Sequence, residues 1–192
     1  MPTSDVAQLH PTSRAGWREW LAANHGSAQE VLLVMDTKAS GSQRLCLDDA
    51  VQEALCFGWI DSRLSPLDDL RFAVMFTPRR RGGTWSRANK ARVESLTAQG
   101  LMTEAGLRAV TAAQQDGSWS ALEDVDALRV PEDLAQALAD TPQAQHNYDS
   151  FTASAQRATL WWVKSAKRSQ TRARRIAESV RLAADNKTIL QR

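Results

Sequence analysis

The order of apolar and polar positions predicts a mixed N-terminal half followed by helices. Trp17, Trp20 and Leu21 have the i, i+3, i+4 spacing of one helix face, so we expect a helix from Arg14 to about Asn24. The β-branched apolar run at 31–35 predicts a buried strand. These two segments begin an α+β arrangement.

Two further strands are predicted at Phe57–Arg63 and Arg71–Thr77. The seven residues between them include Pro66, Asp68 and Asp69, a composition that is typical of a turn. Since a loop of this length joins antiparallel rather than parallel strands, we expect a hairpin.

Helices account for the other patterned segments, and most begin at a capping side chain or at a proline. The expected helices run from Asp48 to Leu55, from Thr84 or Ser86 to Gln99, from Glu104 (capped by Thr103) to Gln115, from Pro131 to Ala139, from Pro142 through Phe151, from Ser154 through Val163 and from Ser169 to Asp185. The predicted fold class is α+β: a mainly helical single domain with a small, mostly antiparallel sheet of about three strands in the N-terminal half. We expect a flexible N-terminal tail over residues 1–13 and one domain over 14–192, with a helical C-terminal part from about residue 131.

The composition fits a globular chain, because 43% of the 192 residues are hydrophobic and 24% are charged. The net charge is +2, but the charge is distributed unevenly along the chain. Residues 70–93 and residues 150–177 each hold seven basic residues and no acid, so the rest of the chain carries −12. If the two basic blocks converge in space they form an electropositive surface; otherwise they are solvated charge on separate faces.

Several classes of protein are not expected. No stretch approaches the roughly 18 consecutive apolar residues of a membrane-spanning helix, so no membrane insertion is expected. Residues 1–12 lack the apolar segment of a secretory signal, and the two cysteines, Cys46 and Cys56, do not form a CxxC pair. We therefore expect a cytoplasmic protein in a reducing compartment.

Motifs for common cofactors and reactions are absent from the sequence. There is no GxxxxGK[ST] or GxGxxG phosphate loop, no HExxH zinc motif and no GxSxG nucleophile motif. His10, His25 and His146 lack metal-ligand spacing, so neither a metal nor a cofactor is expected. Cys56 lies in an apolar run, which predicts a buried, unreactive thiol.

Asp61 is a candidate functional acid because it shares a strand face with Trp59 and Arg63 inside an apolar run. An isolated buried carboxylate is costly, so this one is either paired or functional. An ion pair with Arg63, Arg71 or Arg79 is one explanation, and a polar anchor in a pocket is the other.

The run Arg79–Arg81 precedes a helix start and is followed by two glycines, a setting that favours anions. Arginine binds carboxylate or phosphate in two-point contacts; a solvated loop is the alternative. The two basic blocks together with Trp85, Trp161 and Trp162 also fit a nucleic-acid surface. Against that, no nucleic-acid-binding motif is present, and the pI of about 8.7 is low for such a domain.

Six blocks carry a family resemblance: Trp17…Trp20-Leu21, LCFGWIDS at 55–62, FTPRR at 76–80, TWSRAN at 84–89, GSW at 117–119, and AKR…TRARRI at 166–176. In this order they resemble the YdeI/OmpD-associated family, also described as bacteriocin-protection proteins, across about residues 14 to 185. The resemblance implies a small bacterial protein without an established cofactor or reaction, linked by family name to bacteriocin protection or stress tolerance. A porin association rests on the family name only. Gln170 departs from the glutamate usual in the family and makes the last block more basic.

Together these observations predict a non-catalytic binding domain for an anionic small molecule or polymer. The candidate ligand-binding residues are Trp59, Asp61, Arg79, Arg80, Trp85, Asn89, Lys167 and Arg172. The prediction requires that the acid and the indole of the hairpin share a hollow with the arginine-bearing turn. Two alternatives stay open: an enzyme of unknown class that uses Asp61 or Asp68 beside an arginine-lined pocket, and a nucleic-acid-binding protein.

Overall fold

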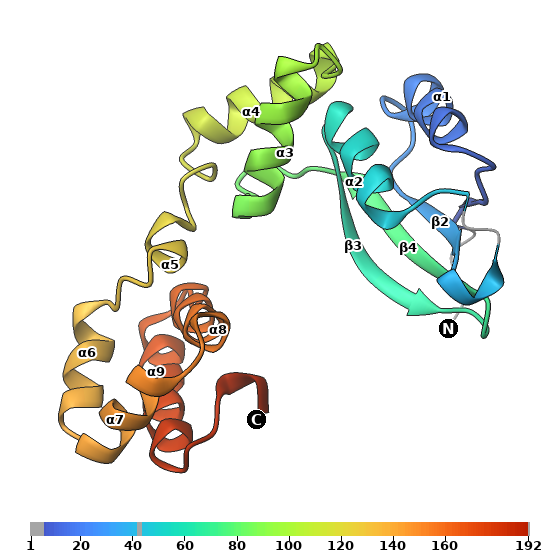
Figure 1. Ribbon diagram of the computed structural model, residues 1–192. Coiled ribbons are helices and arrows are strands. Elements are labelled where there is room, and N and C mark those ends of the chain that lie inside the picture. The colour runs from blue at the N-terminus through green and yellow to red at the C-terminus, as the bar shows by residue number, and fades with distance from the viewer. Residues whose placement is uncertain (1–5, 42–43, 192) are drawn as a thin grey trace. The chain divides into compact units, whose positions relative to one another are not determined.

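The computed structural model describes residues 6–41 and 44–191, and the chain forms two compact units, Met1–Ser120 and Ala121–Arg192 (Figure 1). Each unit has its own hydrophobic core. The sequence predicted one domain over residues 14–192, with a helical part from about residue 131. The second unit is helical and begins ten residues earlier, at Ala121.

The first unit contains a mixed sheet with the strand order β1-β2-β4-β3. Its strands are β1 (Gln8–Leu9), β2 (Val31–Asp36), β3 (Trp59–Pro66) and β4 (Arg71–Pro78). β1 pairs with β2 in parallel, whereas the β2–β4 and β3–β4 pairs are antiparallel. The predicted hairpin is thereby confirmed, but the predicted number of about three strands is too low, since the described residues form four.

The additional strand lies in the segment that the sequence predicted to be a flexible tail. Gln8 pairs with Leu32 and Leu9 with Leu33, and His10 Nε2 lies 3.2 Å from an Asp36 carboxylate oxygen. Residues 6–13 are therefore attached to the sheet, while residues 1–5 lie outside the described part. Two residues are too few to show the alternation of apolar and polar positions that identifies a strand in a sequence. This strand forms because the edge of β2 is available for pairing.

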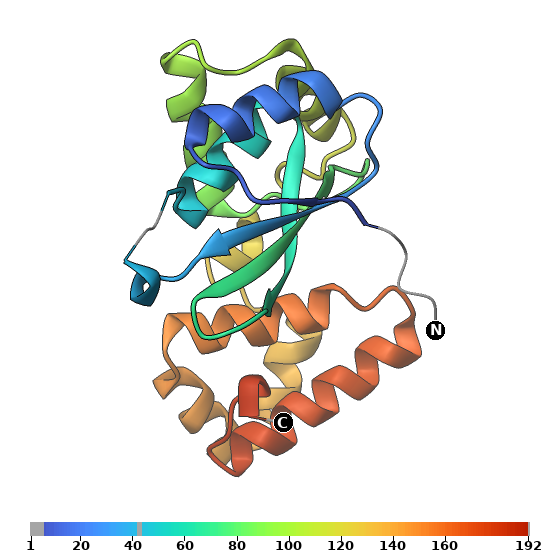
Figure 2. The same cartoon turned by 90° about the vertical axis from the view of Figure 1, so that its right-hand side faces the viewer.

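Helices α1 and α2 cover one face of this sheet (Figure 2). The helices of the unit are α1 (Arg14–Asn24), α2 (Leu47–Cys56), α3 (Arg87–Ala98) and α4 (Glu104–Gln115), with a short 3₁₀ helix at Lys38–Ser40. Trp17 is fully buried, stacks on Trp20 at 5.4 Å and meets Phe76 of β4 at the same centroid distance. The predicted apolar face of the first helix is thus the face that packs on the sheet.

Local capping chemistry sets most helix starts. Ser13, Ser86 and Thr103 each accept a hydrogen bond from a backbone N–H in the first turn, as predicted. The predicted cap at Asp48 is wrong: α2 begins at Leu47, and the thiol sulfur of Cys46 accepts from Asp49 N. Asp48 lies in the first turn and binds Arg92 instead, at 2.6 Å.

Helices α1 and α2 are joined by a buried ionic cluster. Glu53 is 3% exposed, and its two carboxylate oxygens accept from Arg14 Nε at 2.5 Å and from Arg18 Nη1 at 2.6 Å. Arg14 also binds Asp49. A buried carboxylate with two cationic partners keeps its charge satisfied, so the cluster fixes how α1 lies against α2.

The second unit is a bundle of helices. They are α5 (Glu123–Asp126), α6 (Glu132–Ala139), α7 (Pro142–Ser150), α8 (Ala153–Lys164) and α9 (Ser169–Ala184), followed by a 3₁₀ helix at Ile189–Gln191. Leu134, Leu138, Leu160 and Val163 lie in its core. Asn147 ties α7 to α9, because its side-chain amide donates to Ala183 O at 2.8 Å.

The basic residues at the end of the chain do not form one continuous helical face. The sequence placed Lys164, Arg168, Arg172 and Arg175 on one face if their helix were unbroken. The helix ends at Lys164, and α9 begins at Ser169. Arg175 turns back to donate to Trp162 O at 2.5 Å, so part of this charge holds α8 and α9 together.

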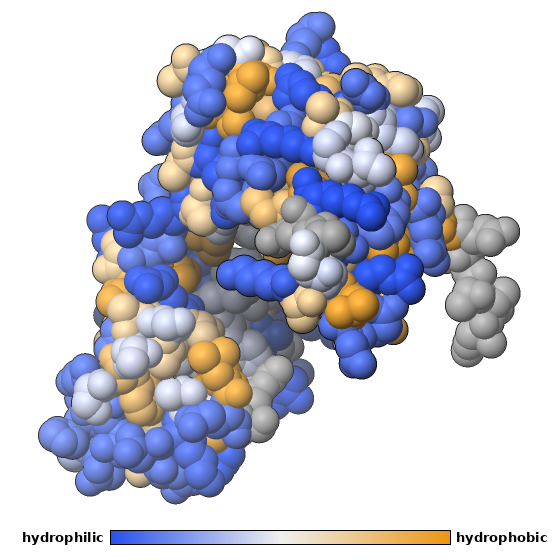
Figure 3. Space-filling model, turned by 45° about the vertical axis from the view of Figure 1, so that its right-hand side comes forward, coloured by the Kyte–Doolittle hydropathy of each residue, from blue (hydrophilic) through white to orange (hydrophobic). Residues whose placement is uncertain are grey.

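The surface carries mixed polarity. Figure 3 shows one face, on which hydrophilic side chains predominate and hydrophobic ones form small separate areas. Among residues 6–41 and 44–191, no helix is both long and apolar enough to cross a bilayer.

Candidate functional site

A cavity of about 210 Å³ lies in the first unit, between the turn that follows β4 and the helix α4. Its lining residues are Arg79, Arg80, Arg81, Gly82, Trp85, Arg108, Ala109, Ala112, Ala113, Asp116 and Ser118. The turn supplies three consecutive arginines, and α4 supplies a fourth together with a floor of alanines. The cavity is therefore small and strongly cationic.

One wall of the cavity is α4, which is held in place by its close approach to the end of α2. A Cβ at Gly106 would lie 2.3 Å from Cys56 O, so only glycine fits there without a shift of backbone. The Thr103 hydroxyl donates to the same carbonyl oxygen at 2.6 Å. Gly106 and Thr103 thus hold the start of α4 on α2, and the rest of α4 carries its side chains to the cavity.

The other wall is tied to the start of β3. Gly58 has a φ of +75°, which glycine adopts without strain, and a Cβ there would lie 3.1 Å from Ala105 O of α4. Gly58 O accepts from Arg79 N at 2.9 Å. This bond fixes the first arginine of the turn at the point where Pro78 ends β4.

Arg79 has an unusual environment for an arginine. Its guanidinium carbon lies 3.5 Å from the ring centroid of Trp85, which is itself 2% exposed and packs on Trp119 at 5.0 Å. Nη1 donates to Thr84 O at 3.4 Å, whereas Nε and Nη2 are buried without any hydrogen-bond partner in the described part of the chain. Two cationic N–H groups therefore lack an acceptor.

Burial lowers the pKa of Arg79 to about 10, and the field of Asp61 opposes this shift only in part. The direction of the shift means that the folded protein disfavours the positive charge at this position. Since arginine keeps its proton at neutral pH, the charge remains and is poorly compensated. An anion in the cavity would provide the missing compensation.

The other charges at the cavity are mostly cationic. Arg80 and Arg81 are exposed, and Arg108 pairs with Glu104 at 3.0 Å on the surface of α4. Among the described lining residues Asp116 is the one acid, and it accepts from Gly82 N at 3.0 Å. A carboxylate thus already holds one backbone N–H of the arginine-bearing turn.

Three predicted ligand-binding residues, Arg79, Arg80 and Trp85, come together at this cavity. Trp59 does not reach it: the side chain is 1% exposed and donates from Nε1 to His25 O at 3.2 Å. Asp61 pairs across the hairpin with Phe76 and is not among the lining residues. Asp61 therefore acts on the site through its charge.

The remaining predicted residues lie elsewhere. Asn89 is buried in the first turn of α3, where its side-chain oxygen accepts from Arg92 Nη1 at 2.9 Å. Lys167 is exposed and Arg172 pairs with Asp133, both in the second unit. The two basic blocks thus belong to different units.

Sequence reasoning missed Arg108, Asp116 and Ser118. They follow the arginine-bearing turn by about thirty residues, and nothing in a linear pattern shows that α4 returns to this turn. A usable signal was the block GSW at 117–119, which the sequence analysis used only for the family resemblance. Its Ser118 is buried, and Trp119 packs on Trp85.

Other chemistry finds little support at this site. The described residues contain no group of three or more His, Cys, Asp or Glu side chains arranged to hold a metal ion. Burial raises the pKa of the Cys56 thiol, in line with an unreactive cysteine. Asp68, the other proposed acid, is engaged by Arg71 at 2.7 Å on the exposed tip of the hairpin.

Comparison with known families divides the chain in the same way. Residues 9–109 match the model described as a domain of unknown function (DUF8412), and residues 127–186 match the model described as bacteriocin-protection, YdeI or OmpD-associated. The predicted YdeI/OmpD-associated resemblance is thereby confirmed over residues 127–186. The sequence blocks at 55–62, 76–80 and 84–89 fall in the range of the other model. No curated protein and no solved structure gave a significant match.

Proposed function

We propose that this chain, which belongs to the DUF8412 family through residues 9–109 and carries a YdeI/OmpD-associated domain at 127–186, binds a small anion in the arginine-lined cavity of its first unit. The binding is non-catalytic. The family description associates the second domain with bacteriocin protection, and an anion-binding step is the part that we assign to this chain.

The observation that supports this proposal is the state of Arg79. It is a half-buried arginine whose Nε and Nη2 are buried and unpartnered, beside a cavity lined by three more arginines. At an effective dielectric constant of about 20, a monoanion about 6 Å from the guanidinium gains roughly 3 kcal/mol. The same interaction offsets the cost of burying Arg79, so binding and folding favour each other.

The size of the cavity limits the ligand. About 210 Å³ lies below the range of roughly 300–1,000 Å³ that is usual for drug-sized ligands. The unpartnered nitrogens expose less than 1 Å² each. A small anion in the cavity therefore compensates the charge of Arg79 through its field rather than through direct hydrogen bonds to these atoms.

A nucleic-acid strand fits this geometry less well. Trp85 is buried beneath Arg79 and has no free face on which a base could stack. Arg71 and Arg92, which belong to the same basic block, are already bound to Asp68 and Asp48. Of the other five basic residues of this block, three line the cavity: Arg79, Arg80 and Arg81.

Titration calorimetry with inorganic phosphate, pyrophosphate and acetate tests the proposal on the full chain. We expect saturable binding of at least one of these anions, weakened at least tenfold by Arg79→Met. Arg87→Ala is the matched control, because Arg87 is an exposed arginine of the same block outside the cavity lining. Equal losses in the two variants, or no binding of any of the three anions to the unaltered chain, would refute the proposal.

A further inference from the structure

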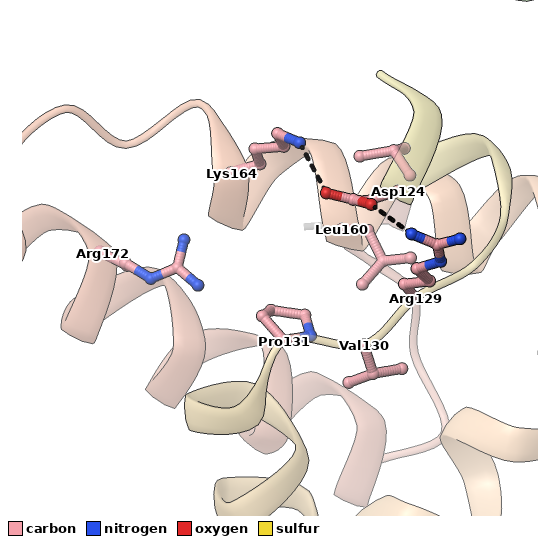
Figure 4. A pocket seen from close by; sticks show the side chains of 8 residues that line it. Asp124, Arg129, Val130, Pro131, Leu160, Lys164 and Arg172 are labelled. Carbon is pink, nitrogen blue, oxygen red and sulfur yellow. Dashed lines mark hydrogen bonds and ion pairs between the residues drawn. The ribbon is translucent and has the colours of Figure 1, made fainter. Parts of the chain in front are cut away.

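A second cavity, of about 380 Å³, lies wholly within the unit 121–192. It is bounded by α5, by the segment that leads from α5 to α6, and by α8 and α9 (Figure 4). The lining residues are Asp124, Val125, Arg129, Val130, Pro131, Leu160, Lys164 and Arg172. Its volume falls within the roughly 300–1,000 Å³ of ordinary small-molecule sites.

The floor of this cavity is apolar and continuous with the core of the unit. Val125 and Leu160 are buried core residues, Pro131 is half-buried, and Val130 remains 37% exposed. Figure 4 shows Leu160, Pro131 and Val130 side by side, between the charged groups. A ligand that covers these side chains gains about 25 cal/mol for each Å² of apolar surface removed from water.

The rim is charged and carries more cations than acids. Asp124 is shared by Lys164, at 3.4 Å, and by Arg129, at 3.1 Å. Arg172 is held by two bonds to Asp133, from Nε at 2.6 Å and from Nη2 at 2.8 Å. The lining thus contains three cations and one acid, while Asp133 fixes the orientation of one of the cations.

Lys164 and Arg172 both have donors available for a ligand. The ammonium group has three donors, and Asp124 takes one of them over a long, exposed contact that contributes little stability. The guanidinium group of Arg172 has five N–H donors; it directs two to Asp133 and one, from Nη1, to Val163 O at 3.4 Å, which leaves two for a ligand. These two side chains come from neighbouring helices and flank the same end of the apolar floor (Figure 4).

We propose that this cavity binds a small amphipathic carboxylate. Its apolar body lies on Val125, Val130 and Leu160, and its carboxylate lies between Lys164 and Arg172. An inorganic anion would leave the apolar floor in water, and an uncharged hydrocarbon would leave the cations without a new partner. This cavity therefore selects a different ligand from the arginine-lined cavity of the first unit, which is smaller and has an alanine floor.

The test uses 3-phenylpropionate as the probe and the full chain as the receptor, with backbone amide chemical shifts as the readout. We expect saturable shifts at Val125, Val130 and Leu160. Inorganic phosphate carries charge without an apolar body, and 3-phenylpropanol carries the same body without charge. Both are expected to bind here at least tenfold more weakly. Equal affinity for either comparison probe, or no saturable shift with 3-phenylpropionate, overturns the proposal.

A pair of matched variants tests the location. Val130→Asp places a carboxylate on the exposed part of the floor and is expected to weaken 3-phenylpropionate binding at least tenfold. Leu190→Asp makes the same kind of change at a residue that is 68% exposed and outside the lining, and is expected to change the affinity less than twofold. Similar losses in the two variants contradict the assignment. Arg79→Met, in the other unit, is expected to leave this binding unchanged, so failure of one cavity does not imply failure of the other.

Discussion

Replacement of Arg79 by methionine is expected to stabilise the empty protein and to weaken its response to anions. Methionine keeps the apolar part of the side chain against Trp85 and removes the buried charge together with its two unpartnered N–H groups. Removal of a poorly compensated buried charge is favourable when an apolar side chain of similar length fills the space.

The magnitude follows from two opposing effects. Burial lowers the pKa of Arg79 from its ordinary value to about 10, and each pKa unit corresponds to about 1.4 kcal/mol, so burial of the charge costs on the order of 3 kcal/mol. Stacking of the guanidinium on Trp85 returns about 1–2 kcal/mol. We therefore expect the free energy of unfolding of the first unit to rise by about 1–2 kcal/mol in Arg79→Met without anion.

Urea denaturation followed by circular dichroism, with and without saturating phosphate, measures both quantities. A ligand at about 100 times its dissociation constant adds roughly 2.7 kcal/mol to the unaltered chain, and at the same concentration it should add at most about 1.4 kcal/mol to Arg79→Met, which binds at least tenfold more weakly. Arg87→Met is the control, since Arg87 is exposed and lies outside the cavity lining, so its loss should change stability by less than about 0.5 kcal/mol and leave the phosphate response intact. A lower free energy of unfolding in Arg79→Met would refute the claim that the charge of Arg79 is poorly compensated. A full phosphate response in this variant would refute the role of Arg79 in anion binding.

Three further predictions follow from individual contacts. Gly106→Ala is expected to lower the free energy of unfolding by about 1–3 kcal/mol and to weaken phosphate binding, because the new Cβ would meet Cys56 O. An unaltered midpoint of urea denaturation would contradict this close approach. Tyr148→Phe is expected to raise stability by roughly 1 kcal/mol, because the buried hydroxyl has no partner among the described residues; thermal denaturation measures it, and a loss of stability would point to a partner. Asp116→Asn is expected to strengthen phosphate binding by roughly threefold to tenfold, because the carboxylate repels anions from the cavity; calorimetry showing weaker binding would contradict that role.

Local features of the fold were predictable from the sequence. Caps at Ser13, Ser86 and Thr103 depend on a residue and the few that follow it, and the hairpin depends on a short turn between apolar runs. The prediction of a cap at Asp48 was wrong. Aspartate is a preferred capping residue and cysteine is not, but the helix is capped two residues earlier by Cys46. The strand Gln8–Leu9 was missed because it depends on a partner in another part of the chain.

The site was predictable only in part, for a related reason. Arg79 and Trp85 are separated by one tight turn, so their stacking follows from local chain geometry. Asp61 pairs with Phe76 across the hairpin and does not line the cavity, so it reaches Arg79 only through its field. Asp116 reaches the cavity because α4 packs back on α2, a tertiary contact that no periodicity encodes.

The most direct measurement of the central claim is the side-chain NMR signal of Arg79. In a phosphate titration of the full chain, the ¹H–¹⁵N signal of Arg79 Nε and that of Trp85 Nε1 should shift together and saturate at one dissociation constant, while the Nε signal of Arg87 stays in place. A saturable response at Arg87 with none at Arg79, or no response at either arginine, would contradict an anion site at this buried guanidinium.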